Sequence, residues 1–393
     1  MDFQNTEIAF ASHDNASLKR SAFLFKLLAR PWMVQVGKSL TMASLYLRLP
    51  VKGIIKQTVF RQFCGGENVE TSKPVAQNLW RHGVGAILDY SVEGQVDEQG
   101  FDRTVEIILE TVHVAAQEDG VPLSVFKMTG VASHEILEKV SAGHELTDED
   151  QDAWNRIRAR VHRICSAAYR QDVPVMIDAE ESWLQKAMDM LAHEAMAEFN
   201  RDKVIVMNTM QCYRTGRQDE LRTFLSNAKA QGYHYGIKLV RGAYMEKERE
   251  RAETMGYPSP IQPTKPLTDA EFDGCVRIMM DAVGTANEPG GAAVVIATHN
   301  ANSCQLGADL LAEQGWTDAQ AAPVWFMQLY GMSDNLSFNL AHARYRVAKY
   351  LPFGPVEQVM PYLFRRAEEN TSVKGQTGRE LQLIQSELKR RRS

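Results

Sequence analysis

Short apolar runs that alternate with longer amphipathic segments constrain the fold of this chain more than any other feature. Eight such runs are rich in Val, Ile and aromatic residues and nearly continuous, as in parallel strands buried on both faces. They span residues 85–90, 123–128, 173–178, 203–211, 235–241, 293–298, 324–329 and 345–350. Helical periodicity separates them at 104–117, 150–169, 181–199, 220–231, 270–286, 302–314 and 335–343. Eight strand–helix units over about 290 residues predict an α/β fold, a (β/α)8 barrel, with a doubly wound open sheet as the alternative.

The rest of the chain is predicted to add helices to this barrel. We expect a polar, loose leader over 1–16, a helical arm over 17–80 that is broken at Arg30 and Pro31, the barrel over 81–371, and a helical tail over 372–393. Charges and Pro31 interrupt the apolar stretch of the arm, so it offers no window of about 18 uncharged apolar residues and predicts no membrane span.

Composition excludes several classes of protein. Hydrophobic residues make up 44% and charged residues 24%, which is typical of a globular chain and not of a disordered one. A net charge of −5 argues against a general nucleic-acid binder. Five cysteines, none in a CxxC pair, indicate free thiols in a reducing compartment, so we expect a cytoplasmic protein.

Polar residues follow almost every predicted strand. In a barrel the active site lies at the carboxyl ends of the strands, and buried polar groups cost about 1–3 kcal/mol each when unpaired. A nearly complete ring of such groups therefore favours a functional site over isolated loop caps. The ring consists of Asp89, Lys127, Asp178, Gln211, Lys238, Arg241, His299, Gln328 and Tyr350.

The helix predicted over 356–370 carries a second signal. Tyr362, Arg365, Arg366 and Glu369 lie on one stripe of that helix. Two adjacent guanidinium groups suit a carboxylate or a phosphate, although an exposed Arg365–Glu369 pair without function is the simpler alternative. Since this helix directly follows the eighth strand, we expect it to cap the strand-end ring.

Absent motifs narrow the chemistry. No GxGxxG follows a predicted strand, and the sequence holds no Walker A lysine motif, no HExxH and no GxSxG. His162 and Cys165 share a helical face, but two ligands do not make a metal site, and we expect none.

Six segments together resemble the proline dehydrogenase (proline oxidase) family, in order and over about 83–370. They are Met176–Glu181 (MIDAEE), Thr209–Tyr213 (TMQCY), Lys238–Tyr244 (KLVRGAY), Ala297–Asn300 (ATHN), Gln328–Met332 (QLYGM) and Tyr362–Asn370 (YLFRRAEEN). The resemblance implies a distorted barrel with non-covalent FAD that oxidises L-proline to Δ1-pyrroline-5-carboxylate. Hydride would pass from the ring carbon next to nitrogen to flavin N5, and electrons would go on to a membrane quinone.

The resemblance also implies roles for residues around the substrate. Arg365 and Arg366 match the pair that holds the proline carboxylate. Lys127 and Asp178 match charged groups near the substrate, and Tyr350 matches the tyrosine over the proline ring. The further substrate-binding positions that it implies are Leu239, Tyr244, Tyr362 and Glu369.

For the flavin the resemblance implies a second set of residues. Lys238 stands where many members carry arginine near flavin N5, which is a departure from the family pattern. The set consists of Asp178, Gln211, Lys238, Arg241, Ala243, Thr298, His299 and Gln328. The chain ends 23 residues past Asn370, so the aldehyde dehydrogenase fused in bifunctional relatives is expected to be a separate protein that acts downstream.

Two alternatives remain at this point. A Schiff-base barrel lyase of the class I aldolase type would use Lys127 or Lys238 as its amine nucleophile. Such an enzyme is colourless and is trapped by borohydride with substrate, whereas a flavoprotein is yellow. A binding module without catalysis is the third interpretation, favoured if neither chemistry appears.

Charge segregation in the arm predicts a surface interaction. Residues 15–66 contain no acidic side chain but nine basic ones, interleaved with aromatic and aliphatic residues. The basic residues are Lys19, Arg20, Lys26, Arg30, Lys38, Arg48, Lys52, Lys56 and Arg61. The pattern suits peripheral contact with an anionic membrane, at the inner face of the cytoplasmic membrane, although a helical arm packed on the barrel is the simpler interpretation. Both hold if one face packs and the basic face meets lipid.

Overall fold

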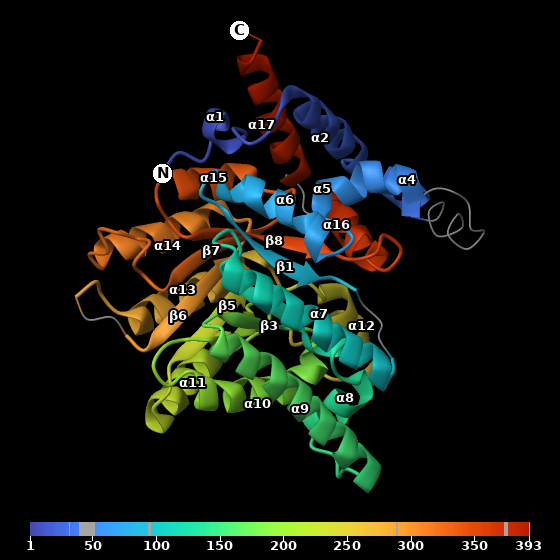
Figure 1. Ribbon diagram of the computed structural model, residues 1–393, viewed down its shortest axis with the longest axis vertical. Helices are drawn as coiled ribbons and strands as arrows, with labels where there is room; N and C mark the ends of the chain where they lie inside the picture. The colour runs from blue at the N-terminus through green and yellow to red at the C-terminus, as the bar shows by residue number, and fades with distance from the viewer. Residues whose placement is uncertain (31, 39–51, 93–95, 288–289, 373–375, 393) are drawn as a thin grey trace. The chain divides into compact units, whose positions relative to one another are not determined.

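The computed structural model describes residues 1–30, 32–38, 52–92, 96–287, 290–372 and 376–392 (Figure 1). The chain divides into two compact units. Unit 1 comprises Met1–Glu93 and Gln328–Ser393, and unit 2 comprises Gly94–Met327. The boundaries expected from the sequence at 80 and 371 mark changes in secondary-structure pattern, whereas the two units are defined by compactness. Those boundaries therefore stay predictions.

Unit 2 is built from parallel strands and the helices that follow them. Each strand from β2 to β6 pairs in parallel with the next one along the chain, which requires a crossover helix at every step. Its strands are β2 (Ser124–Lys127), β3 (Val175–Asp178), β4 (Val206–Gln211), β5 (Tyr235–Val240), β6 (Ala292–Ala297) and β7 (Val324–Leu329), the last of which runs across the unit boundary. Its helices are α7 (Glu98–Gln117), η2 (Met128–Gly130), α8 (His134–Ala142), α9 (Asp148–Arg170), α10 (Ser182–Phe199), α11 (Arg217–Gln231), α12 (Met245–Met255), α13 (Lys265–Val283) and α14 (Ala301–Glu313).

Unit 1 pairs the first strand with the last. β1 (Gly85–Tyr90) lies parallel to β8 (Val347–Phe353) over six residue pairs. Its helical segments are α1 (Thr6–Ala9), α2 (Asn15–Leu28), residues 32–38, α4 (Lys52–Ile55), the π-helix η1 (Lys56–Phe60), α5 (Arg61–Phe63), α6 (Val69–Trp80), α15 (Asp334–His342), α16 (Met360–Ser372) and α17 (Gln376–Arg390).

The strand order identifies the fold class. It runs β1-β8-β7-β6-β5-β4-β3-β2, so every strand after the first neighbours its predecessor or successor, and the first neighbours the last. This is the order of a (β/α)8 barrel, and it excludes the doubly wound sheet, whose order reverses at a switch point. The predicted barrel is confirmed, and each of the eight predicted strands is present.

The amino-terminal residues differ from the expected loose leader. α1 lies within that segment, and Phe3, Ala9 and Phe10 are buried. The side-chain amide of Asn335 in α15 donates to the Phe3 carbonyl at 3.0 Å. The segment is ordered because it buries apolar side chains and hydrogen-bonds to α15, and a helix of four residues is too short to show in a periodicity.

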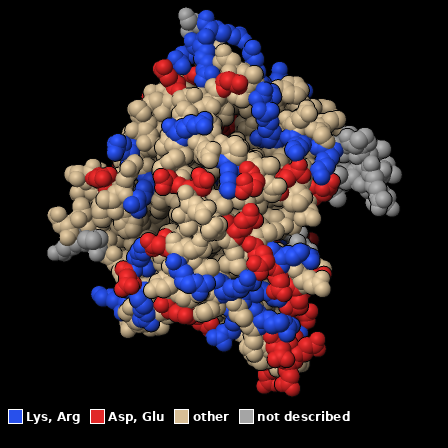
Figure 2. Space-filling model, in the orientation of Figure 1, with Lys and Arg blue, Asp and Glu red and all other residues tan. Residues whose placement is uncertain are grey.

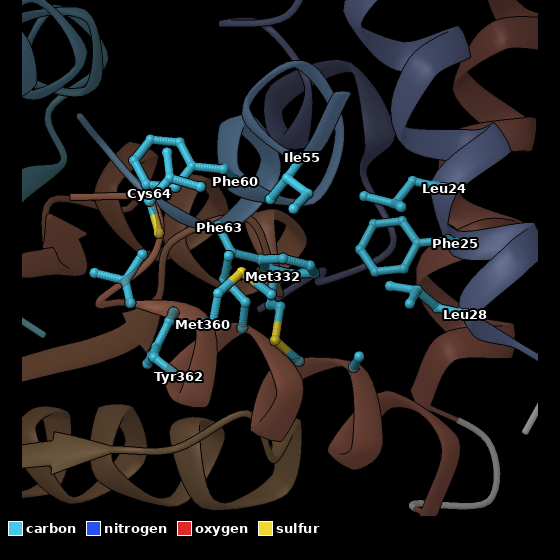
Figure 3. Packing of buried hydrophobic residues seen from close by; sticks show 14 of the residues in the cluster. Leu24, Phe25, Leu28, Ile55, Phe60, Phe63, Cys64, Met332, Met360 and Tyr362 are labelled. Carbon is cyan, nitrogen blue, oxygen red and sulfur yellow. The ribbon is translucent and has the colours of Figure 1, made fainter. Parts of the chain in front are cut away.

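An apolar cluster in unit 1 fixes the arm and the last helices (Figure 3). Leu24, Phe25 and Leu28 project from one face of α2, and Phe25 meets Phe63 edge to face at 6.4 Å between ring centroids. Met360 and Tyr362 of α16 belong to the same cluster. Burying a side chain of this size contributes about 1.5–3 kcal/mol, so this face of the arm is held by packing. The break predicted at Arg30 and Pro31 is consistent with α2 ending at Leu28, although Pro31 lies outside the described residues.

Candidate active site

Three charged side chains meet at the carboxyl ends of strands in unit 2. Lys127 ends β2 and lies in register with Asp178, which ends β3. Lys127 Nζ is 3.4 Å from Asp178 Oδ2, and Lys238 of β5 donates to Asp178 Oδ1. The side chains of Lys238 and Asp178 are 5% and 13% exposed, so the cluster is largely out of water. Two ammonium groups on one carboxylate leave net positive charge, which suits an anion or negative charge that develops during a reaction.

The neighbouring residue on β5 points elsewhere. Leu239 is fully buried and follows Lys238 directly, so its side chain lies on the opposite face of the strand from the Lys238–Asp178 pair. Its predicted role in the substrate pocket stays a prediction.

An arginine cradle lies beside this cluster, also in unit 2. The Arg241 guanidinium donates to Asp269 at 2.7 Å, to Thr298 Oγ1 at 2.6 Å and to Ser303 Oγ at 3.0 Å, and it lies 4.4 Å above the Phe272 ring. These contacts fix its plane while leaving further N–H donors on its two terminal nitrogens. α14 begins three residues after Thr298. A positioned guanidinium and a helix N-terminus are the groups that bind phosphate.

Gln211 and the turn after β5 lie near the same strand ends. Gln211, at the end of β4, is buried and its side-chain oxygen accepts from the Ala243 N–H at 3.4 Å. Gly242 has φ +135°, and a Cβ there would lie 2.6 Å from the Tyr213 ring, so this turn requires glycine. His299 follows Thr298 and is half-buried, while Tyr244 precedes α12 and lies under the Lys247 ammonium at 5.9 Å.

This donor set fits a flavin dinucleotide. Arg241, Thr298 and the start of α14 suit phosphates, and the exposed backbone of Gly242 and Ala243 permits close approach of a ligand. The side chains of Gln211 and Lys238 offer hydrogen-bond donors near the strand ends, as the polar edge of an isoalloxazine ring requires.

A second group of predicted residues lies in unit 1. Tyr350 of β8 is 7% exposed, and Gln328 of β7 is buried and accepts from Ser337 Oγ at 2.7 Å. On α16, Arg366 is buried and stacks on the Tyr362 ring at 5.1 Å, one helical turn away. Arg365 is half-buried on the same helix. The side chain of Glu369 lies outside the described residues, so its predicted role stays a prediction.

Sequence reasoning missed a buried charge network in unit 1. Lys349, one residue before Tyr350, is fully buried, and its Nζ lies 2.7 Å from Asp334 Oδ1. His13 Nε2 lies 2.9 Å from the other Asp334 oxygen. Burial acts to raise the pKa of Asp334, but the Lys349 ammonium and His13 outweigh it and hold that pKa well below its ordinary value. A lysine inside a buried strand was the available signal, since such a charge requires a partner.

Asp89, the first member of the predicted ring, has a local partner. It is 1% exposed at the end of β1, and Ser91 Oγ bonds to its carboxylate. The predicted residues thus fall into two groups, one in each unit. Unit 2 holds the Lys127–Asp178–Lys238 cluster with Gln211, Arg241, Ala243 and Thr298. Unit 1 holds Gln328, Tyr350, Tyr362, Arg365 and Arg366.

Comparison with known proteins settles the family. The model of the family described as proline dehydrogenase matches residues 73–379. The chain belongs to the proline dehydrogenase family. It is therefore an oxidoreductase of that family, and nothing in the comparisons favours the Schiff-base lyase.

Three proteins illustrate what this chain is similar to. Proline dehydrogenase 1, mitochondrial, of Arabidopsis thaliana is 31% identical over 438 residues, covering 100% of this chain and 86% of the relative. Hydroxyproline dehydrogenase of Xenopus laevis is 30% identical, covering 95% of this chain and 86% of the relative. Among solved structures, proline utilization A from Bdellovibrio bacteriovorus, inactivated by N-propargylglycine, superposes with a TM-score of 0.72 at 18% identity, covering 97% of this chain and 38% of that one. The last likeness concerns the fold alone.

Proposed function

We propose that this protein oxidises L-proline to Δ1-pyrroline-5-carboxylate with non-covalently bound FAD and passes the electrons to a quinone. Membership of the proline dehydrogenase family supports the substrate and the reaction. The observation that carries the proposal is the buried Asp178 carboxylate shared by Lys127 and Lys238 at adjacent strand ends. The fit of the Arg241 cradle to a dinucleotide supports the cofactor.

The residues of this chain would supply binding and orientation. Arg365 and Arg366 offer planar forks for the proline carboxylate, and Tyr350 offers a ring face to the apolar part of the substrate. Lys127 and Lys238 place positive charge where negative charge accumulates, and Asp178 holds both ammonium groups in place. The proline amine must be neutral, because its lone pair assists departure of the hydride. When bound, FAD supplies the two-electron acceptor.

The flavin would be held by the remaining predicted residues. In this proposal Arg241, Thr298 and His299 bind the phosphates and adenosine, while Asp178, Gln211, Lys238, Ala243 and Gln328 line the isoalloxazine ring. Tyr244 and Tyr362 would line the substrate pocket with Glu369.

One absorbance experiment tests this proposal. The purified protein should be yellow, and its flavin bands should bleach on anaerobic addition of L-proline. Acid precipitation should release the chromophore into the supernatant, because no covalent link is expected. A colourless protein that borohydride traps with a carbonyl substrate would instead support the lyase that uses Lys127 or Lys238.

We also propose that the arm makes peripheral contact with an anionic membrane, which would bring the enzyme to its quinone. Four large apolar side chains in the arm are exposed: Phe23, Trp32, Val36 and Ile54 are 65%, 63%, 48% and 67% exposed. Exposed Lys19, Arg20, Lys26 and Arg30 lie among them, and Figure 2 shows basic side chains gathered over α2 and α17. Exposed apolar and basic groups together suit a lipid surface.

The two interpretations of the arm apply to different faces of α2. Its buried face packs in the apolar cluster, so the lipid contact would use the opposite face. Among the helices that the structure describes, none is long and apolar enough to cross a membrane. The proposed location is the cytoplasm, at the inner face of the membrane, with a separate Δ1-pyrroline-5-carboxylate dehydrogenase downstream.

A further inference from the structure

Glu180 is a buried carboxylate that none of the roles above uses. It lies two residues after Asp178, in the turn after β3, and is 5% exposed. Both of its oxygens accept from one residue of the turn after β2: the Thr129 N–H donates to Oε1 at 2.9 Å and the Thr129 hydroxyl donates to Oε2 at 2.5 Å. The carboxylate therefore joins the turns that follow two adjacent strands.

The main chain of Glu180 extends this link to two further strands. The Gln211 side-chain amide, at the end of β4, donates to the Glu180 carbonyl at 2.6 Å. The oxygen of the same amide accepts from Ala243, after β5. A continuous set of contacts thus runs across the ends of β2, β3, β4 and β5, where Lys127, Asp178 and Lys238 lie.

We propose that Glu180 is a positioning residue for proline oxidation, which fixes Asp178 between Lys127 and Lys238 and sets the orientation of the Gln211 amide. The inference rests on the proposed function. Glu180 itself touches no reacting group; it acts through the turn it shares with Asp178 and through its contacts with Thr129 and Gln211. Errors in the placement of catalytic groups by about 1 Å cost up to about a hundredfold in rate, so such a link has a measurable effect.

The ionisation of this carboxyl offers a second readout. Burial raises the pKa of Glu180 to about 7, an effect that Glu181 adds to and that the Thr129 hydrogen bonds and Lys127 oppose. The ionised form accepts both Thr129 bonds. As pH falls through about 7 the carboxyl takes up a proton and loses part of its acceptor capacity. Its negative charge then no longer offsets the positive charge of the nearby Lys127.

Three variants separate the carboxylate charge from its hydrogen bonds. Glu180→Ala removes both, Glu180→Gln keeps the shape and can bond to Thr129 but does not titrate, and Thr129→Val removes the hydroxyl alone. Glu181→Gln is the matched control, because Glu181 is the adjacent carboxylate and pairs with the exposed Lys247 at 3.0 Å. For each holoenzyme we would measure kcat, KM for proline, the pH profile of kcat/KM, the flavin spectrum and the thermal midpoint.

We expect Glu180→Ala to lower kcat at least about tenfold, with displaced flavin bands, and Thr129→Val to lower it about threefold. Glu180→Gln should lose an inflection near neutral pH that the wild type shows. Glu181→Gln should keep that inflection, moved to lower pH because one negative neighbour is gone, and should stay within about twofold of the wild-type kcat above it. Should Glu180→Ala fail to fold, the other two variants decide.

Two results would overturn the inference. One is wild-type kcat, KM and pH profile in both Glu180→Gln and Thr129→Val. The other is a lowered thermal midpoint in the Glu180 variants with unchanged turnover and pH profile, which would make the role purely structural. Failure of the proposed function looks different, because the wild-type protein itself would then show no flavin bands that bleach with proline.

Discussion

Two buried strand lysines, one in each unit, have different surroundings. The side chains of Lys238 on β5 and Lys349 on β8 are 5% and 0% exposed, and each is paired with an aspartate. Asp178 has a second cation, Lys127, and the cluster carries excess positive charge at the strand ends. Lys349 instead bonds to Asp334 and to the Met332 carbonyl, at the start of α15. Burial of a lysine therefore indicates a required partner, and the two pairs differ in what else the aspartate contacts: Lys127 in one and His13 in the other.

The largest expected effect comes from exchanging each lysine for Met. Lys349→Met leaves the Asp334 carboxylate buried with His13 alone, which should lower the free energy of unfolding by about 3–5 kcal/mol. Lys238→Met leaves Asp178 paired with Lys127, so folding should persist while proline oxidation falls about a hundredfold. Urea unfolding and turnover of both variants provide the measurements.

A double variant sharpens the same comparison. Lys349→Met with Asp334→Asn removes both charges and should recover part of the stability lost in the single variant. Equal stability losses for Lys349→Met and Lys238→Met, or full activity in Lys238→Met, would contradict the distinction between the two lysines.

The arginine pair of α16 tests the substrate-binding residues that are predicted in unit 1. Replacing Arg365 or Arg366 by Met removes a charge-assisted bond to the substrate carboxylate, worth about 1.5–3 kcal/mol. The KM for proline should rise at least about tenfold while FAD stays bound, whereas Lys238→Met should act mainly on kcat. Steady-state kinetics with parallel flavin quantification measure both; an unchanged KM in both arginine variants would refute the assignment.

Tyr350 tests substrate choice in the same unit. If its ring packs on the proline ring, little room remains for a 4-hydroxyl, so proline should be preferred to trans-4-hydroxyproline. Tyr350→Ser should raise the relative kcat/KM for hydroxyproline. The similarity of the chain to a hydroxyproline dehydrogenase makes this comparison informative. Equal kcat/KM values in the wild type, or no relative gain in the variant, would count against this role.

The smallest expected effect concerns the two faces of α2. Binding to anionic vesicles should weaken with added salt, because each basic side chain contributes about 1 kcal/mol that counter-ions screen. Changing Lys19, Arg20, Lys26 and Arg30 to Gln should reduce co-sedimentation, while Phe25→Ala, on the buried face, should mainly lower stability. Equal pelleting with neutral and anionic lipid would argue against the lipid surface.

Local patterns predicted most of the fold because barrel strands are short and apolar throughout. β1 and β7 match their predicted runs residue for residue, and the other strands differ at their ends. β8 was predicted over 345–350 but spans Val347–Phe353, because Pro352 and Phe353 continue the pairing with β1. That extension depends on a partner strand far away in the sequence, so no local window contains it.

The candidate site shows the same division between local sequence patterns and contacts between distant segments. The amino-acid sequence by itself determined which residue types end the strands and which share a stripe on the last helix, because both follow from backbone periodicity. Only the tertiary structure decided that Asp178 serves two lysines, that Glu180 bonds to Thr129, and that Lys349 belongs to Asp334. His13 and Asp334 are separated by 321 residues along the chain, and the pairing of buried charges over such distances is set by which strands and helices pack together.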